Sequence, residues 1–162
     1  ADVPASRREQ LQKVIQQQLD NDDQELSTWK PDSALSRFNQ YQGAQPWPVS
    51  EGMADIVTMA LRIGAKTDGA MDITVGPLVN LWGFGPTKAP QHTPSQAQID
   101  QAKALTGLQH LKVIQTVQGQ ASQKDLPGLY VALSTMGEGY ATDHLARLLA
   151  SQGVTKYLVS VG

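Results

Sequence analysis

The sequence TDGAMDITVGPLVNLWGFG, residues 67–85, gathers glycine and aspartate at the end of a strongly amphipathic segment. That segment begins after Ser50, and its apolar residues recur at the spacing of a buried helical face: Met53, Ile56, Val57, Ala60, Leu61 and Gly64. The periodicity stops at Thr67, so residues 67–77 are predicted to form a loop. Because glycine has no side chain, its backbone can approach a ligand closely, and this loop is a candidate binding site.

Shorter patterns predict the remaining elements. Ser6 and Glu9 form a capping box that predicts an N-terminal helix, with Leu11, Val14, Ile15 and Leu19 on its inner face. Ser95 and Gln98 form a second one, for a helix that turns Ile99, Ala102 and Leu105 inward and stops at Gly107. A surface connection is expected over residues 86–94, a last helix over 137–152, and strands over 110–117, 129–133 and 157–161. Helices mixed with non-adjacent strands indicate the α+β class.

Length and composition limit the possible functions. The chain has 162 residues, 40% of them hydrophobic and 17% charged, which suits one globular domain over residues 1–162 with no internal boundary. The net charge of −2 contains no basic block, so nucleic acid is not expected as a partner. The absence of cysteine excludes disulfides, thiolate metal sites and cysteine nucleophiles. No apolar run approaches the roughly 20 residues of a membrane span.

Histidine and familiar nucleotide motifs do not supply the chemistry. His92, His110 and His144 lie far apart without a second ligand at metal-binding spacing, and we interpret them as structural or surface residues. No nucleophile elbow, phosphate-binding P-loop or dinucleotide fingerprint is present. In the loop over residues 67–77, Asp72 can accept hydrogen bonds from the edge of a nucleobase or flavin ring. Equally, Asp68 and Asp72 can simply cap turns, and both interpretations stay open.

Two further segments are candidates for ligand contacts. LSTMGEGYATDH, residues 133–144, is predicted at a strand-to-helix junction, where a helix N-terminus favours an anion such as phosphate. Glu138 is expected in the first turn of that helix, either at a ligand or complementing the helix dipole. In DSALSRFN, residues 32–39, Arg37 is either a phosphate contact or an internal anchor, and the anchor is favoured.

Together, and in this order, the three segments resemble the ApbE family of FAD:protein FMN transferases. The similarity rests on a set of matched positions that runs through nearly the whole chain: Ser33, Leu35, Ser36, Arg37, Phe38 and Asn39; Thr67, Gly69, Asp72, Thr74, Val75, Gly76, Pro77, Leu78, Leu81, Trp82, Gly83 and Phe84; Leu133, Ser134, Thr135, Glu138, Gly139, Tyr140, Ala141 and Asp143. The resemblance implies an ApbE-like, T-fold-like mixed sheet with packed helices, incomplete at the C-terminus.

The resemblance also implies a site. FAD would be the substrate, contacted by Trp29 (where relatives tend to have tyrosine), by Ala70, Met71 and Asp72, and by Glu138. Thr135 would offer one ligand to Mg²⁺, a hard ion that prefers oxygen donors. No catalytic residue is assigned.

The activity that the resemblance implies is magnesium-dependent transfer of FMN from FAD to a threonine hydroxyl of an acceptor protein, with release of AMP. Acceptors of relatives include subunits of membrane redox pumps, and some relatives also hydrolyse FAD to FMN and AMP. The expected location is the periplasm, with the full-length protein anchored to the inner membrane by a lipid that this chain lacks. The alternatives are a periplasmic FAD-binding protein without transferase activity, and a structural relative that binds no flavin.

The chain departs from the family pattern in two places. Ala132 occupies a position where many relatives carry an aspartate expected to help hold FAD, and alanine has no side-chain acceptor. Family members are also about twice as long as an ordinary domain of this size. The missing half would supply aspartate-rich metal ligands and more of the FAD pocket, so we expect the chain to be a partial one, inactive as a transferase by itself.

Overall fold

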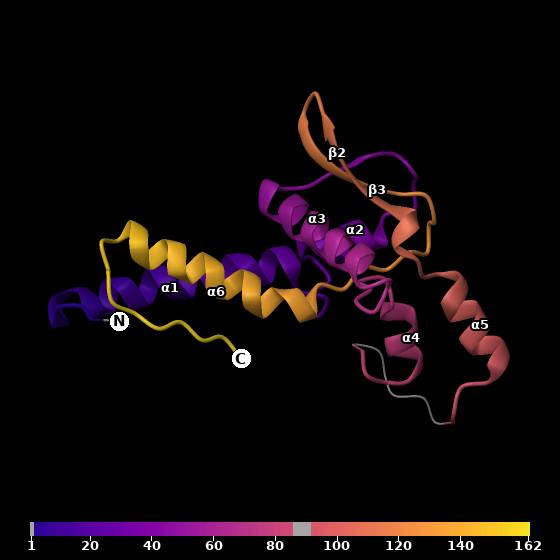
Figure 1. The fold of residues 1–162 in the computed structure, drawn as a ribbon, viewed down its shortest axis with the longest axis horizontal. Helices are drawn as coiled ribbons and strands as arrows, with labels where there is room; N and C mark the ends of the chain where they lie inside the picture. Colours follow the sequence, from indigo (N-terminus) through magenta and orange to yellow (C-terminus); the bar gives the residue numbers. More distant parts are fainter. Residues whose placement is uncertain (1, 86–91) are drawn as a thin grey trace.

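A computed structural model describes residues 2–85 and 92–162, so most of the predicted connection over 86–94 lies outside the described residues. The elements follow in this order: α1 (Ala5–Leu26), α2 (Ala34–Gln40), β1 (Trp47–Pro48), α3 (Glu51–Lys66), α4 (Gly76–Leu81), α5 (Gln96–Ala104), the 3-10 turn η1 (Leu108–His110), β2 (Leu111–Thr116), β3 (Gly119–Lys124) and α6 (Ser134–Ser151) (Figure 1). Helices around a small sheet confirm the α+β class. No described helix is long and apolar enough to cross a membrane.

The described sheet has three strands in the order β1-β3-β2, and both pairings are antiparallel. β2 confirms the strand predicted over residues 110–117. The central strand β3, GQASQK, has no β-branched or aromatic residue, which is why the sequence does not predict it. A tight turn sets its register: Thr116 pairs with Gly119 across two residues, and Gly119 has a φ of 125°, which glycine adopts without strain.

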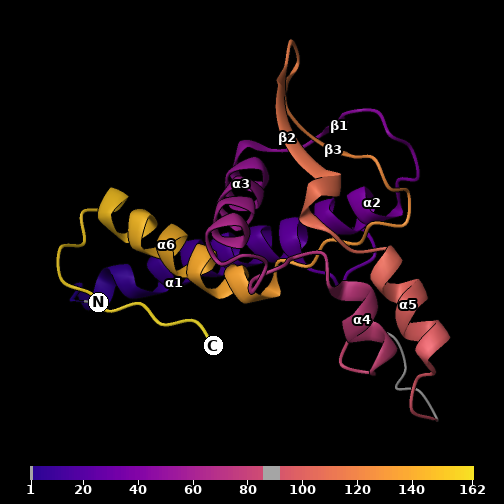
Figure 2. The ribbon, with the colours of Figure 1, turned by 45° about the vertical axis from the view of Figure 1, so that its right-hand side comes forward.

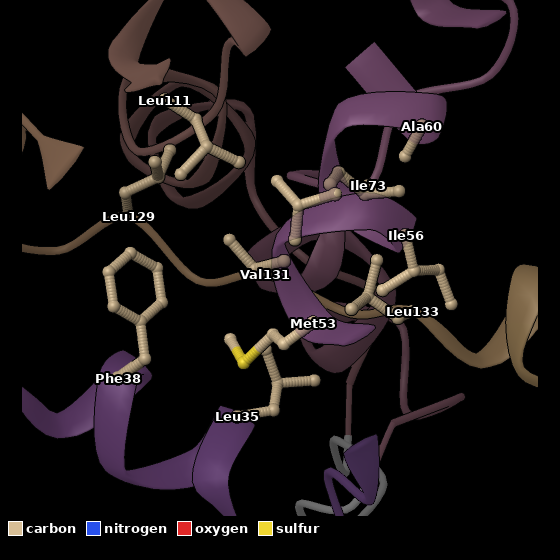
Figure 3. Packing of buried hydrophobic residues seen from close by; sticks show 11 residues of the cluster. Leu35, Phe38, Met53, Ile56, Ala60, Ile73, Leu111, Leu129, Val131 and Leu133 are labelled. Atoms are coloured by element: carbon tan, nitrogen blue, oxygen red, sulfur yellow. The ribbon is translucent and has the colours of Figure 1, made fainter. Parts of the chain in front are cut away.

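The main core lies between α2, α3 and the extended residues 129–133 (Figure 3). As predicted, Ser50 caps α3 by accepting a hydrogen bond from the Met53 N–H, and five of the six predicted positions of its apolar face are buried. These side chains meet Leu35 and Phe38 of α2, which are 0% and 1% exposed. Burying each large apolar side chain contributes about 2 kcal/mol, so this contact holds the centre of the chain together.

A second, smaller cluster joins the two longest helices. α1 and α6 lie side by side in both views (Figures 1 and 2). Leu11 of α1 packs there against Leu149 of α6 and against Val154, and Val159 covers them.

The histidines bind neighbouring carboxylates or lie at the surface. His144 of α6 links to α1, because its Nδ1 lies 2.9 Å from Asp22 Oδ1. His110 is likewise bound to Asp125, at 2.6 Å, and His92 is exposed, so the histidines have the expected structural or surface roles.

Residues 129–133 form no strand, contrary to the sequence prediction. Alternate side chains of this segment do point inward as in a strand, since Leu129, Val131 and Leu133 are almost fully buried. The backbone groups of this segment, however, do not form hydrogen bonds with a neighbouring strand. The Asn39 side chain donates to the Val131 C=O at 2.9 Å and accepts from the Val131 N–H at 2.8 Å. The Ala132 N–H donates to the Ile73 C=O at 2.9 Å. A side chain and a loop thus replace the neighbouring strand.

Lys124, at the end of β3, also holds residues 129–133 in place, next to α2. Its side chain is 1% exposed, and its ammonium lies 4.9 Å from the centre of the Phe38 ring. The ammonium donates to the carbonyl oxygens of Phe38 (2.9 Å), Asn39 (3.2 Å) and Leu129 (3.4 Å). One buried cation therefore ties the end of α2 to the start of the extended segment. Burial lowers the pKa of Lys124 to about 8.

Four other predictions are corrected. α1 begins at Ala5 after Pro4 and has no side-chain cap, because Ser6 lies inside the first turn instead of preceding it. The capping box of Ser95 and Gln98 is confirmed, but Leu105 follows the end of α5 and is exposed. α6 begins at Ser134, earlier than predicted. Residues 157–161 form no strand, since no described strand lies beside them, and they run extended near α1 and α6.

Replacing the buried ammonium should loosen this anchor. We expect Lys124→Met to lower the free energy of unfolding by about 2 kcal/mol, because three buried carbonyl oxygens lose a charged donor. Urea denaturation of the purified chain measures the loss. Lys112→Met, on the exposed side of β2, is the matched control and should change stability by less than about 0.5 kcal/mol.

The difference between wild type and Lys124→Met should also depend on pH. Above about pH 8 the folded chain releases a proton from Lys124 that the unfolded chain keeps up to its ordinary pKa of 10.5. Stability from this group therefore increases as the pH rises between those values, and the loss caused by Lys124→Met should grow with it. A loss that stays constant or shrinks from pH 8 to pH 10 would contradict the buried-ammonium account.

Candidate functional site

A cavity of about 400 Å³ lies where the glycine-rich loop, α4 and the start of α6 meet. Six of the seven residues predicted at the site line it: Trp29, Ala70, Met71, Asp72, Ala132 and Thr135. They come from three separate stretches of the chain, around residue 29, over 70–72 and over 132–135, and the fold brings these stretches together. The volume is within the range of small-molecule sites, about 300–1,000 Å³.

Two residues with a left-handed backbone conformation shape the loop that carries Ala70, Met71 and Asp72. Asp68 and Gly69 have φ values of 53° and 80°, and the Gly69 N–H donates back to the Gly64 C=O at 2.8 Å. The Thr67 hydroxyl closes the turn by donating to Ile63 C=O (2.7 Å) and accepting from the Met71 N–H (3.2 Å). This tight reversal at the end of α3 directs residues 70–72 into the cavity wall.

Asp72 both lines the cavity and organises the loop. Its Oδ1 accepts hydrogen bonds from the Thr74 N–H at 2.8 Å and from the Thr74 hydroxyl at 2.6 Å. The Thr74 hydroxyl, completely buried, in turn accepts from the Gly107 N–H at 2.8 Å. The turn-capping interpretation of Asp72 is therefore confirmed. Its place in the cavity wall keeps the ligand-contact interpretation open as well.

The opposite wall is the extended segment and the first turn of α6. Because Leu129, Val131 and Leu133 point into the core, the intervening Tyr130 and Ala132 face the cavity. Ser134 and Thr135 follow as the first residues of α6, and both are lining residues that carry a hydroxyl group. The first N–H groups of a helix have no intrahelical partner, so this end can bind an anionic group such as a phosphate.

The cavity lining includes two aromatic side chains that are largely exposed to solvent. Trp29 is 70% exposed and Phe84 is 82% exposed, and both contribute to the lining. Val75 and Val79 add partly exposed apolar surface from the start of α4. A planar ring system can stack on such side chains, because aromatic faces and ring edges attract one another.

Thr28 and Tyr130 are site residues that the sequence analysis missed. Burial raises the pKa of Tyr130, and its interaction with the Thr28 side chain partly offsets that rise. The ring of Tyr130 packs against Gly76, where a Cβ atom would lie 2.3 Å from Cδ1. The sequence did contain a signal for Tyr130: apolar residues alternate along residues 129–133, and this alternation places Tyr130 on the same face as Ala132.

Glu138 and Arg37 are not in the cavity wall. α6 starts at Ser134, so Glu138 lies in the second turn instead of the first, and its side chain is exposed outside the lining. Arg37 is exposed on α2, which contradicts its predicted role as an internal anchor. It lines a different hollow, together with Glu25 and Trp47.

Metal-binding capacity within the described residues is limited. Nowhere in residues 2–85 and 92–162 do three or more histidine, aspartate or glutamate side chains gather so as to hold a metal ion. Thr135, the residue predicted to bind magnesium, lines the cavity and carries a hydroxyl oxygen, the kind of ligand that this ion prefers.

The close contact between Tyr130 and Gly76 gives a test of the cavity wall. We expect Gly76→Ala to lower the free energy of unfolding by about 1–3 kcal/mol, because the new methyl group displaces the Tyr130 ring. Gly139→Ala is the matched control, since a Cβ there meets nothing within 4 Å and the position is inside α6. That variant should raise stability by up to about 1 kcal/mol. Equal effects of the two substitutions in urea denaturation would contradict the packing described.

Comparisons with known proteins agree on one family. The sequence model of the ApbE family matches residues 2–162. A curated FAD:protein FMN transferase of Salmonella typhimurium is 68% identical over 160 residues, which are 99% of this chain and 46% of the relative. The corresponding protein of Escherichia coli K12 gives the same values. The chain thus spans about half the length of the curated relatives it matches.

Solved structures show the same similarity. The flavin transferase ApbE from Vibrio cholerae superimposes with a TM-score of 0.89 at 41% identity, covering 100% of this chain and 50% of that one. The apo form of the Pseudomonas stutzeri flavinyl transferase ApbE gives a TM-score of 0.87 at 35% identity, over 99% of this chain and 49% of that one.

Proposed function

We propose a flavin-transfer function for this chain, because it belongs to the ApbE family. In this proposal the protein of which the chain is part moves FMN from FAD to a threonine hydroxyl of an acceptor protein and releases AMP. The residues described here form one wall of the FAD site. Since the chain spans about half of its curated relatives, the complete activity is assigned to the whole protein.

The observation that carries the proposal is the convergence of six predicted flavin-site residues on one cavity. Its lining includes exposed aromatic side chains for a planar ring, and its far wall is the N-terminal turn of α6, suited to a phosphate. A larger cavity of about 870 Å³ between α3 and α6 shares Met71 and Thr135 with it. The two spaces together suit a long ligand in which a pyrophosphate separates two ring systems.

The proposed reaction breaks one phosphoanhydride bond of FAD and forms one phosphoester bond to the acceptor. The threonine oxygen of the acceptor attacks the phosphorus on the FMN side of the FAD pyrophosphate, and a new P–O bond forms. The P–O bond to the bridging oxygen breaks, and AMP leaves with that oxygen. The hydroxyl proton passes to a base, for which the described residues provide no assignment. The protein contributes mainly by positioning the reactants and by stabilising charge.

Magnesium dependence is part of the proposal. A bound magnesium ion would offset negative charge on the pyrophosphate. Of the described residues, Thr135 is the one that we assign as a ligand, and its hydroxyl fits the oxygen preference of the ion. The remaining protein ligands are expected from other parts of the full protein.

The cellular setting stays a prediction from the family resemblance. We propose that the protein acts in the periplasm, attached to the inner membrane by a lipid anchor outside this chain. The proposed acceptors are subunits of membrane redox pumps that carry FMN on threonine. The absence of cysteine from the chain is compatible with an oxidising compartment but does not select one.

A second candidate function is FAD binding without transfer, and Ala132 favours it. Ala132 lines the cavity at the position where relatives carry an aspartate, so one expected hydrogen bond to the ligand is lost. Under this alternative FAD is held and recovered intact. Hydrolysis of FAD to FMN and AMP is a further alternative, in which water replaces the threonine hydroxyl.

Mass spectrometry separates these functions. The full-length protein is incubated with FAD, Mg²⁺ and a threonine-bearing acceptor protein, and the control is the same acceptor with threonine replaced by alanine. Transfer predicts that the threonine acceptor alone gains the mass of FMN minus one water, with one AMP per acceptor. AMP without any mass gain indicates hydrolysis, and intact FAD under every metal condition indicates binding alone; either result sinks the transferase proposal.

Restoring the carboxylate tests the site itself. We expect Ala132→Asp to lower the dissociation constant of FAD about tenfold, the effect of one additional charged hydrogen bond of about 1.4 kcal/mol. Isothermal titration calorimetry with the full-length protein measures the change. Ala132→Asn, which has the same shape without the charge, should give a smaller gain. Unchanged or weaker binding by Ala132→Asp would mean that the ligand does not contact this wall.

A further inference from the structure

Thr74 lies behind the wall of the flavin-site cavity, without access to solvent. It is 0% exposed and is not a lining residue, although Asp72, two positions earlier, is one. The intervening Ile73 holds the backbone in place, because its side chain is buried in the main core and its C=O accepts from the Ala132 N–H at 2.9 Å. Thr74 therefore makes its side-chain hydrogen bonds from a fixed position.

The hydroxyl of Thr74 has a single proton, and its two partners determine where that proton goes. The Gly107 N–H donates to Thr74 Oγ1 at 2.8 Å, so the oxygen is the acceptor in this bond. The proton is left for Asp72 Oδ1, 2.6 Å away, because a carboxylate oxygen can only accept. The Thr74 N–H donates to the same oxygen at 2.8 Å. The carboxylate of Asp72 therefore cannot rotate without breaking two hydrogen bonds to one buried residue.

The second oxygen of Asp72 is available to a ligand. Within residues 2–85 and 92–162, both hydrogen bonds of the Asp72 side chain are made by Oδ1 and none by Oδ2. Oδ2 is not sealed in the core either: Asp72 is half-buried and lines the cavity, and the buried side-chain atoms without a partner belong to Asp22 and Ser122. Oδ2 is thus the acceptor that Asp72 offers at the cavity.

We propose that Thr74 is a positioning residue for ligand recognition: its hydroxyl holds Asp72 so that Oδ2 accepts a hydrogen bond from an N–H group at the edge of a ligand ring. That this ligand is FAD rests on the proposed function, whereas the fixing of Asp72 by Thr74 does not. FAD has such donors on both rings, the imide of the flavin and the amino group of adenine. A carboxylate that is already held in place loses less freedom when the ligand binds, so binding is tighter.

NMR of the ligand-free, full-length protein tests the fixing of Asp72. Three-bond couplings to its carboxyl carbon show whether the side chain has one rotamer. We expect one rotamer in the wild type and in Thr74→Ser, and averaging in Thr74→Val. The Gly107 amide should exchange at least about tenfold faster in Thr74→Val, because it loses its acceptor. Thr142→Val, which removes a hydroxyl bonded to the Glu138 C=O on α6, is the matched control and should change neither measurement.

FAD affinity provides the second measurement. Asp72→Asn should raise the dissociation constant at least about tenfold, because the amide keeps its oxygen on the Thr74 N–H and turns a donor toward the cavity. Thr74→Val should raise it about fivefold, the effect of one side chain that must be ordered on binding. Thr74→Ser and Thr142→Val should bind like the wild type. In the Asp72→Asn background, Thr74→Val should cause no further loss, because the carboxylate that it positions is gone.

Two fragments of FAD identify the ring that is recognised. FMN carries the flavin imide without adenine, and ADP carries the adenine amino group without flavin. Thr74→Val should weaken the binding of one fragment and leave that of the other unchanged. Equal weakening of both would mean that the substitution distorts the whole loop, and it would overturn the positioning role.

Failure of this proposal and failure of the proposed function give different results. If the wild type binds no FAD, the proposed function fails, and the Asp72 couplings still decide whether Thr74 fixes the carboxylate. The positioning role is overturned if Asp72 keeps one rotamer in Thr74→Val, if Thr74→Ser behaves like Thr74→Val, or if the effects of Thr74→Val and Asp72→Asn on affinity multiply. Should Thr74→Val lose stability, Thr74→Cys replaces it, with a weaker donor of similar size. It should give an intermediate loss of affinity, and unchanged affinity would overturn the role.

Discussion

The clamp on residues 129–133 is the interaction on which the rest of the structure depends. The buried ammonium of Lys124 binds carbonyl oxygens on both α2 and Leu129, and the Asn39 side chain satisfies both backbone groups of Val131. Buried backbone groups without partners are costly, so a segment that crosses the core outside a sheet needs such substitutes. Here two polar side chains provide them.

This clamp connects the core with the candidate site. The alternation that buries Leu129, Val131 and Leu133 turns Tyr130 and Ala132 toward the cavity, and α6 starts directly afterwards with Ser134 and Thr135. On the facing wall, Asp72 and Thr74 brace the glycine-rich loop, and the Ile73 C=O bonds to Ala132. The two walls are thus joined by a backbone hydrogen bond of 2.9 Å, and the flavin proposal rests on a cavity with a defined shape.

Local signals in the sequence predicted what local chemistry determines. Capping side chains gave the starts of α3 and α5, and matched motifs gave the family and six cavity residues. Predictions failed where residues distant in the sequence determine the local structure. The strand β3 is polar and exists through its neighbours β1 and β2, whereas residues 129–133 look like a strand but pair with Asn39. Thr28 was missed because only the fold brings it to the cavity. Glu138 was displaced because α6 begins early, at Ser134.

Hydrogen exchange at the Val131 amide tests the central claim most directly. The account predicts that this amide exchanges slowly in the wild-type chain, since it donates to Asn39 Oδ1 and Val131 is 0% exposed. In Asn39→Ala its protection should fall at least about tenfold, and that of Ala132, bonded to Ile73, should fall with it. Rapid exchange of Val131 in the wild type, or undiminished protection in Asn39→Ala, would show that the segment is held in some other way.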